Sequence, residues 1–322
     1  MQQGEPSKSA LAMAKLRAAH QVLDGGKALL DPYACAMAGV DPAAISKAGF
    51  GERKDLIRRL GTAMRSRFSE DTLGRAVEAG VRQAVSVGAG LETFGLRNPY
   101  ADRGLKVFEV DHPATQSWKR DRIAEWQTSP PNLPIWVPAD LERDDLAGVL
   151  SAAGFRRDRP AFFSLLGLVG YLERKTVRAV LEFIGTVPHS HAVFDYVVPI
   201  EHIRPELRDN TSRRRAHAAK VGEPVISEID PESMHRMLGE VCLAVERDYD
   251  FLKLMAYFGW NVPGETSGGH STLFMQPPQR RNPATVPQQT SQAAHQTTAS
   301  SDFAGSNSGA INSQVWREAL IV

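Results

Sequence analysis

Short runs of apolar residues recur along the first 276 residues and are separated by longer segments in which apolar and polar residues mix. Five of these runs have the length and composition of strands, and they lie at 84–87, 106–110, 135–137, 161–166 and 191–197. The segments between them are helix-like, and strands that alternate with helices favour a parallel sheet covered on both faces. We therefore predict an α/β fold with a doubly wound sheet.

Helices are predicted on both sides of this strand series. From Ser7 to Leu23 the chain places Met13, Leu16, His20 and Leu23 on one helical face. Start residues, and stop residues such as Gly80 and Gly185, predict further helices. These helices span 69–80, 142–153, 173–184 and 231–243, and two more predicted strands lie over 244–248 and 271–275.

The composition divides the chain into one domain and a tail. We predict a domain over residues 1–276, with a helical cap over 7–80 and a basic, helical insertion over 199–222 after the fifth strand. From Pro277 to Ser313 the only acid is Asp302 and the only aromatic residue is Phe303. Such a segment cannot bury enough apolar surface to offset its ordering entropy. Residues 277–322 are therefore predicted to be a disordered tail.

Three turns that follow the first three predicted strands have residues suited to a nucleoside. Gly88-Ala89-Gly90 follows the first strand, and a backbone without side chains can approach a ligand closely. Asp111 ends the second strand, where an acid can accept both ribose hydroxyls. Asp140 and Leu141 follow the third, where they suit an adenine amine and ring. Each feature alone is also typical of a plain turn or a helix cap. Their order after successive strands predicts an adenosine site.

The glycine turn separates two cofactor classes. A dinucleotide site has the pattern Gly-x-Gly-x-x-Gly, in which the third glycine lets helix and strand pack closely. Thr93 occupies that third position here, and the chain has no P-loop pattern. S-Adenosylmethionine carries one nucleoside and no phosphate, so it suits the shorter turn better. We predict S-adenosylmethionine as the cofactor.

Six short stretches of the chain also occur in a known family. They are DPYA (31–34), GVRQ (80–83), VGAGLET (87–93), FEVDHP (108–113), VFDY (193–196) and GEP (222–224). In this order they resemble the leucine carboxyl methyltransferase family, in particular its bacterial and secondary-metabolite O-methyltransferase branch. The similarity runs from about Leu11 to about Phe258. It implies a Rossmann-like class I methyltransferase.

The resemblance implies roles for individual residues. Gly88 matches the glycine at the methionine end of the cofactor, and Gly90 belongs to the same turn. Asp111 matches the ribose-binding acid, and Asp140 with Leu141 matches the adenine-contacting pair. Arg67 resembles the arginine that binds the cofactor's carboxylate through two parallel hydrogen bonds, with Arg65 as the alternative.

Three positions depart from the family pattern. Glu92 and Phe94 stand where the family usually has Asp and Arg, and Leu166 stands where many members carry an acid that helps to hold the cofactor. These departures keep a non-catalytic, cofactor-binding homologue as an alternative.

The acceptor side is less defined. Arg17 in the first helix, Arg213 in the insertion and Tyr196 at the exit of the fifth strand are candidate substrate contacts. His20 and His217 are candidate bases, but no catalytic residue is assigned. A carboxylate, with a pKa of about 4, is already ionised at neutral pH and needs no base. The sequence therefore places a carboxylate slightly ahead of a phenol as acceptor.

Composition excludes several other classes. Lys and Arg total 38 against 37 Asp and Glu, for a net charge of +1, which lacks the basic footprint of a nucleic-acid binder. The longest apolar stretch, 161–172, is shorter than the roughly 20 residues of a membrane helix. Cys35 and Cys242 form no metal-spaced pair. We expect a cytoplasmic enzyme with no metal, nucleic-acid or membrane partner.

The predicted activity is methyl transfer to oxygen on a small carboxylate or phenol of polyketide-like character. A protein carboxyl methyltransferase acting on another protein's C-terminus is the second hypothesis. The sequence leaves the oligomeric state open.

Overall fold

The computed structural model describes residues 6–46, 53–203, 205–220, 222–260 and 272–276. These residues form a sheet of seven strands in the order β3-β2-β1-β4-β5-β7-β6. The strands are β1 (Gln83–Val87), β2 (Lys106–Asp111), β3 (Ile135–Pro138), β4 (Phe162–Leu165), β5 (His191–Asp195), β6 (Ala244–Tyr249) and β7 (Thr272–Gln276). The first five are parallel, and strand order reverses between β1 and β4. The predicted doubly wound α/β fold is confirmed.

The last strand departs from the parallel sheet predicted for the whole series. β7 pairs antiparallel with β5 on one side and with β6 on the other. Its first residue, Thr272, lies beside Tyr249 at the end of β6. Parallel pairing requires a connection that crosses back over the sheet, whereas antiparallel pairing does not. Because β7 begins where β6 ends, no crossover is needed.

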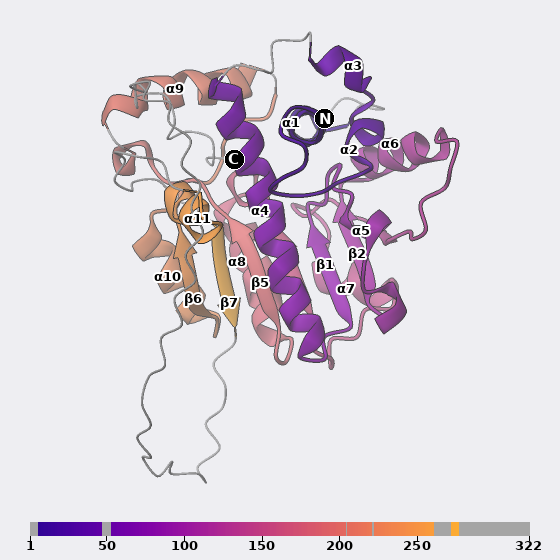
Figure 1. The fold of residues 1–322 in the computed structure, drawn as a ribbon. Helices are drawn as coiled ribbons and strands as arrows, with labels where there is room; N and C mark the ends of the chain where they lie inside the picture. The colour runs from indigo at the N-terminus through magenta and orange to yellow at the C-terminus, as the bar shows by residue number, and fades with distance from the viewer. Residues whose placement is uncertain (1–5, 47–52, 204, 221, 261–271, 277–322) are drawn as a thin grey trace, which may run out of the picture.

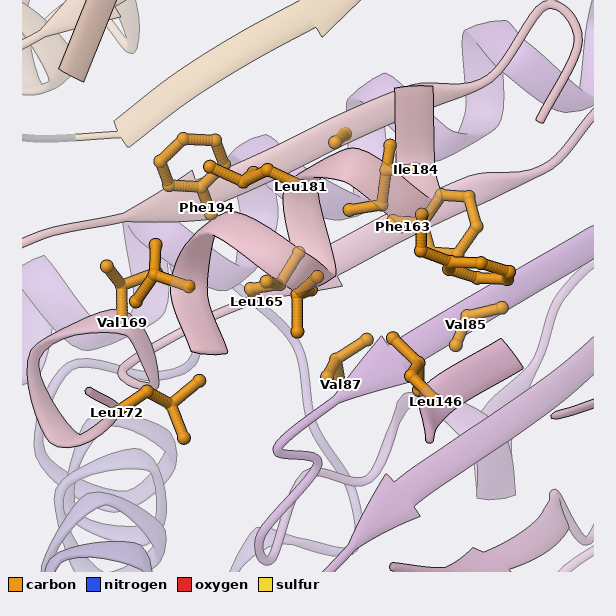
Figure 2. Close-up of a cluster of buried hydrophobic side chains, with 14 of the residues drawn as sticks. Val85, Val87, Leu146, Phe163, Leu165, Val169, Leu172, Leu181, Ile184 and Phe194 are labelled. Atoms are coloured by element: carbon orange, nitrogen blue, oxygen red, sulfur yellow. The ribbon is translucent and has the colours of Figure 1, made fainter. Parts of the chain in front are cut away.

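Alternate residues of the central strands enter two different cores. Val85 and Val87 of β1 belong to the larger apolar cluster, together with Phe163, Leu165 and others (Figure 2). Ala84 of β1 and the corresponding alternate residues of β2, β4 and β5 belong to a second cluster on the opposite face. A strand buried on both faces needs apolar side chains at nearly every position. This requirement explains why the strands were readable from apolar runs.

Helices cover both faces of the sheet (Figure 1). The larger cluster includes buried residues of α7 (Leu146–Ala152), α8 (Arg174–Thr186) and α10 (Pro231–Glu240). The second cluster includes residues of α4 (Arg53–Glu78) and α11 (Phe251–Tyr257). In Figure 1, α4 runs along the near face of the sheet and α8 lies behind it.

Short helices ahead of α4 and one helix after β5 lie at one end of the sheet. The first three helices, α1 (Lys8–Leu23), α2 (Ala34–Ala38) and α3 (Pro42–Ile45), share a third apolar cluster. Small residues such as Ala14, Ala18 and Ala34 let them approach closely. Helix α9 (Pro205–Lys220) lies in the predicted insertion. The remaining helices are α5 (Phe94–Arg97) and α6 (Pro113–Ala124). No helix within the described ranges is both long and apolar enough to cross a membrane.

Several predicted helix boundaries are wrong, among them the end predicted at 243, because α10 ends at Glu240. Ser69 is not a helix start, because it is a buried residue inside the long α4. The helix predicted from 142 begins at Leu146, where the Asp145 carboxylate caps the backbone N–H groups. Gly185 does not end α8, which runs to Thr186. A Cβ at Gly185 would lie 2.2 Å from the Val241 carbonyl oxygen, so glycine serves close packing there.

Candidate active site

A pocket of about 330 Å³ lies at the carboxyl ends of β1 to β4, where the strand order reverses. Ligands bind at this position in doubly wound sheets, and the volume suits a small molecule. We call the turns and segments after these strands the strand side of the pocket. We call the other lining segments the cover: Ser7 and the lining residues of α1, together with Gly222, Glu223, Pro224 and Ile226. The two parts hold different predicted residues.

The glycine turn forms the floor of the strand side. Gly88 has φ +68° and Gly90 φ +51°, a left-handed conformation that other residues rarely adopt. The backbone N–H groups of Gly88 and Ala89 donate to the Val110 carbonyl at 2.8 and 3.1 Å. A Cβ at Gly88 would lie 2.7 Å from a methyl carbon of Leu168. Glycine at this position therefore lets the turn pack against the segment after β4.

Asp111 ends β2 beside the glycine turn. Its Oδ2 accepts a hydrogen bond from the Gly90 N–H at 2.5 Å, and its Oδ1 accepts one from the His112 N–H at 2.7 Å. Burial raises the pKa of Asp111 above its ordinary value, although both backbone donors oppose this rise. A carboxylate has about four lone-pair sites. Both oxygens can thus accept further hydrogen bonds from a ligand's hydroxyl groups.

Asp140 and Leu141 follow β3 and also line the pocket. The Ala139 N–H donates to the Asp111 carbonyl at 2.8 Å, so the two turns are joined. Oδ1 of Asp140 accepts from the Glu142 N–H at 3.1 Å. The sequence left open whether Asp140 caps the next helix, and Asp145 holds that role instead. The structure therefore brings Gly88, Gly90, Asp111, Asp140 and Leu141 to one pocket.

Arg65, and not Arg67, reaches the pocket from α4. Nε of Arg67 donates to Asp71 at 2.6 Å, and the Arg67 side chain is 46% exposed outside the pocket. Arg65 lines the pocket with 3% exposure. Residues two positions apart on a helix differ by about 200° in direction. The predicted placement of Arg67 in the pocket is wrong, and the alternative Arg65 takes that position.

Asp195 holds Arg65 in place and was missed from the sequence. Its Oδ2 accepts from Nη1 of Arg65 at 2.6 Å, and its Oδ1 accepts from the Gly167 N–H at 2.5 Å. Both side chains of the pair are almost fully buried. Asp195 belongs to the VFDY stretch, which was noted for the resemblance only. Nε of Arg65 has no hydrogen-bond partner among the described residues.

Arg17 of α1 lines the pocket, as predicted, within a network of charges. Its Nη2 donates to the Leu91 carbonyl at 2.6 Å, and its Nη1 lies 3.5 Å from Oε1 of Glu92. Nε of Arg17 lies 3.8 Å from Asp31. Burial opposes ionisation of Glu92, but Arg17 and Arg97 hold the pKa of Glu92 below its ordinary value. The glutamate that departs from the family pattern is thus an ionised partner of Arg17.

The other two departures have different surroundings. Phe94 packs against the apolar cluster beneath α4. Leu166 is partly buried, packs against the same cluster and also lines the pocket beside Gly167. An apolar wall therefore stands where many family members carry an acid.

Four predicted acceptor-side residues lie outside the pocket. Tyr196 is fully buried in the core, and its hydroxyl hydrogen-bonds to Asp248 at 3.1 Å. Its position continues the in-and-out alternation of β5 into the core. Arg213 and His217 are exposed on α9. His20 is fully buried, and its Nε2 accepts from the Ala28 N–H at 3.2 Å, which is a structural role.

Several lining residues had no signal that pointed to the pocket. On the strand side they are Leu168, Tyr171 and Leu172, and on the cover they are Ser7, Ser9, Met13, Glu223 and Ile226. Glu223 belongs to the GEP stretch, but its partners Ser7, Lys8 and Ser9 lie more than 200 positions earlier in the chain. No pattern in the residues next to Glu223 could have indicated these contacts.

Comparison with known proteins agrees with this geometry. The model of the leucine carboxyl methyltransferase family matches residues 10–185. A relative from Mycobacterium avium strain 104, named as a candidate S-adenosyl-L-methionine-dependent methyltransferase, is 33% identical over 272 residues, with 78% of this chain and 82% of the relative covered. A similarly named relative from Mycobacterium sp. strain KMS is 36% identical over 162 residues. That match covers 50% of this chain and 51% of the relative, so the chain spans about half its length.

A solved structure shares the fold. A DUF574 family protein from Streptomyces avermitilis is 16% identical, with a TM-score of 0.52 and coverage of 85% of this chain and 99% of that one. The sheet order and the pocket at its switch point define a Rossmann-like methyltransferase fold. The chain belongs to the leucine carboxyl methyltransferase family.

Proposed function

We propose that the protein transfers a methyl group from S-adenosyl-L-methionine to an oxygen atom of a small, largely apolar molecule. One observation carries the proposal: the glycine turn, Asp111 and the Asp140–Leu141 pair line one pocket at the strand-order reversal. Membership of the family, and the names of the relatives, support the same activity.

The residues of the pocket fit the cofactor. Nε of Arg65 is buried and lacks a partner among the described residues, and a guanidinium is suited to bind the methionine carboxylate. Asp111 holds two oxygens toward the position of the ribose hydroxyls. Leu141 offers an apolar surface, and Asp140 an acceptor, for the adenine. When bound, S-adenosylmethionine supplies a methyl group that is already activated by its positive sulfur.

The protein's own contribution is alignment and exclusion of water. Asp195 fixes Arg65, which can then hold the methionine carboxylate from a defined position. Leu166 and Leu168 line the pocket beside it with apolar surface. On the cover, Met13, Pro224 and Ile226 continue this surface, and Ile226 is 54% exposed. An acceptor with an apolar body can bury itself against these side chains.

The charge of the pocket favours a hydroxyl acceptor over a carboxylate. The described lining residues include five carboxylates, namely Glu92, Asp111, Asp140, Glu142 and Glu223, against two arginines, Arg17 and Arg65. Both arginines already contact protein oxygens, and a negative lining repels an anion. Arg213, the anchor suggested by the sequence, does not line the pocket. We expect the methyl group on a phenolic or similar hydroxyl, whose proton passes to one of the lining carboxylates as the O–CH3 bond forms and the S–CH3 bond breaks. This reverses the order predicted from sequence.

Binding and turnover test this proposal separately. Calorimetry should show that the protein binds S-adenosylmethionine and S-adenosylhomocysteine but not a nicotinamide dinucleotide. Transfer of a labelled methyl group should then be assayed against a pool of phenols and carboxylic acids, followed by mild alkali. We expect the label to survive alkali, as an aryl ether does. Release of labelled methanol would show a methyl ester, and label in added protein would favour the protein-substrate hypothesis. Binding without turnover would point to a non-catalytic homologue.

A further inference from the structure

The Glu223 carboxylate lies on the first turn of α1, although the two are more than 200 positions apart in sequence. Its Oε1 accepts from Oγ of Ser7 at 2.9 Å and from the Lys8 N–H at 2.7 Å. Its Oε2 accepts from the Ser9 N–H at 2.7 Å. One side chain from the segment after α9 thus binds three donors of the first helix.

These bonds do more than cap the helix. The first N–H groups of a helix lack partners within the helix, and its N-terminus attracts negative charge. Ser7 already supplies an ordinary cap, because its Oγ accepts from the Ala10 N–H at 3.2 Å. What Glu223 adds is position: it fixes the first turn of α1 relative to the segment after α9.

The turn fixed in this way lies over the proposed cofactor site. Ser7, Ser9, Ala10 and Glu223 all line the pocket. A Cβ at Gly90 would lie only 3.2 Å from Cβ of Ala10, so α1 rests on the glycine turn. The first turn of α1 therefore contacts both the glycine turn and Glu223.

The opposite flank of the turn is also attached. The Ser7 N–H donates to Oγ1 of Thr115 at 3.4 Å, and Thr115 lies in α6, directly after Asp111 and His112. The first turn of α1 is therefore held by α6 on one side and by Glu223 on the other. In Figure 1, α1 and α9 both lie at the same end of the sheet. The attachment to Glu223 is the stronger one, with three bonds to a charged group.

We propose that Glu223 is a positioning residue that holds α1 closed over the bound cofactor. It slows the departure of the cofactor and keeps water from the reacting methyl group. The proposal rests on the proposed function, because it assigns S-adenosylmethionine to the pocket. Glu223 itself takes no part in the chemical step.

The test compares Glu223→Ala and Glu223→Gln with the unaltered protein. We expect S-adenosylhomocysteine to dissociate about tenfold faster from Glu223→Ala, equivalent to about 1.4 kcal/mol. Glu223→Gln should be intermediate, because its amide oxygen keeps the bonds from Ser7 and Lys8 but its NH₂ group cannot accept from Ser9. KM for S-adenosylmethionine should rise, while kcat at saturating cofactor falls much less. A purely structural loss would lower the apparent kcat through the folded fraction and leave KM unchanged.

Two further measurements separate the possible failures. Glu228→Ala is the matched control, because Glu228 lies on the same connection, pairs with Arg215 at 2.8 Å and is outside the pocket. It should leave the dissociation rate unchanged. Hydrogen exchange at the Lys8 and Ser9 amides should quicken in cofactor-free Glu223→Ala, a readout that needs no cofactor. A Glu223→Ala protein with the Tm of the control and unaltered dissociation would overturn the proposal. If the unaltered protein fails to bind S-adenosylmethionine, the proposed function itself is wrong.

Discussion

The strand side and the cover of the pocket are held together in different ways. On the strand side, Asp111 at the end of β2 accepts hydrogen bonds from the adjacent His112 and from Gly90, which lies in the turn after the neighbouring strand β1. On the cover, Glu223 and its partners Ser7 and Ser9 lie more than 200 positions apart in sequence. The first arrangement follows from the sheet, whereas the second exists only once the whole domain has formed. Variants on the strand side should therefore change cofactor affinity most. Variants of the cover should change it less, and variants of ion pairs away from the pocket should change mainly the stability.

Asp111→Ala is expected to have the largest effect, because it removes both acceptor oxygens from the strand side. Hydrogen bonds to a charged group are worth about 1.5–3 kcal/mol each. Loss of two should lower the affinity for S-adenosylhomocysteine about a hundredfold or more, measured by calorimetry. Asp102→Ala, an exposed acid outside the pocket, should leave affinity unchanged. Equal affinities of the two variants would place the ribose elsewhere.

Arg65→Lys and Arg67→Ala test which face of α4 binds the methionine end. Arg65→Lys keeps a positive charge near Asp195 but loses the planar fork, so affinity should fall about tenfold. Arg67→Ala should leave affinity unchanged, since Arg67 contacts only Asp71 in the described structure. The opposite ranking would restore the assignment made from sequence. Arg65→Ala would also leave Asp195 buried without its cation, at a cost of about 3–5 kcal/mol in stability.

The ion pair between Asp24, at the end of α1, and Arg59 of α4 gives a pH-dependent test of the stability of these helices. Burial opposes its ionisation, but hydrogen bonds from Arg59 and His20 lower the pKa of Asp24 from 3.8 to about 2. Because the pKa of Asp24 is lowered in the folded state, its ionisation stabilises the fold at any pH above its ordinary pKa of 3.8. This stabilisation is lost as the pH falls from about 4 toward 2. Asp24→Asn should therefore lower the free energy of unfolding by about 1–2 kcal/mol at neutral pH. In chemical denaturation the difference should vanish near pH 2. A difference independent of pH would show that packing, not charge, makes the contribution.

Cutting the chain after Gln276 should have the smallest effect. The removed residues, 277–322, lie outside the described part of the structure, and the stretch from 277 to 313 is poor in core-forming residues. Thermal unfolding should remain cooperative, and the affinity for S-adenosylhomocysteine should not change. Loss of the cooperative transition would mean that Trp316, Leu320 and Ile321 bind back to the domain.

The strand side could be read from sequence because its residues follow directly from the strands. A strand buried on both faces is a visible apolar run, and the residue after its last position must lie at the tip of the sheet. Arg67 was assigned from the family resemblance, with Arg65 as the alternative. Because Ser69 was taken as a helix start, the direction in which α4 presents these two arginines could not be used to choose between them. The prediction that Tyr196 lines the pocket was wrong for a different reason. It considered only the position of Tyr196 at the exit of β5, and not the alternation of β5, which turns this side chain into the core.

The cover was unpredictable for a physical reason. The hydrogen bonds of Glu223 satisfy N–H groups that any helix start leaves unpaired, so Ser7, Lys8 and Ser9 carry no mark of a distant partner. Charge pairs such as Arg65–Asp195 are likewise set by how α4 lies on the sheet. One sequence shows which groups need partners but does not show which partners they find.

The position of β7 also bears on the order in which the protein can be completed during synthesis. Residues 272–276 fill the gap between β5 and β6, so the edge of β5 waits for a segment made about 80 residues later. Until then a nascent chain presents the unpaired backbone of a buried, apolar strand, the kind of edge that pairs readily with another chain. Asp195, which positions Arg65, lies at the end of that same strand and pairs with Thr272 in the sheet. A chain cut short before this segment would therefore present an unpaired β5 edge next to Asp195 and the proposed cofactor pocket.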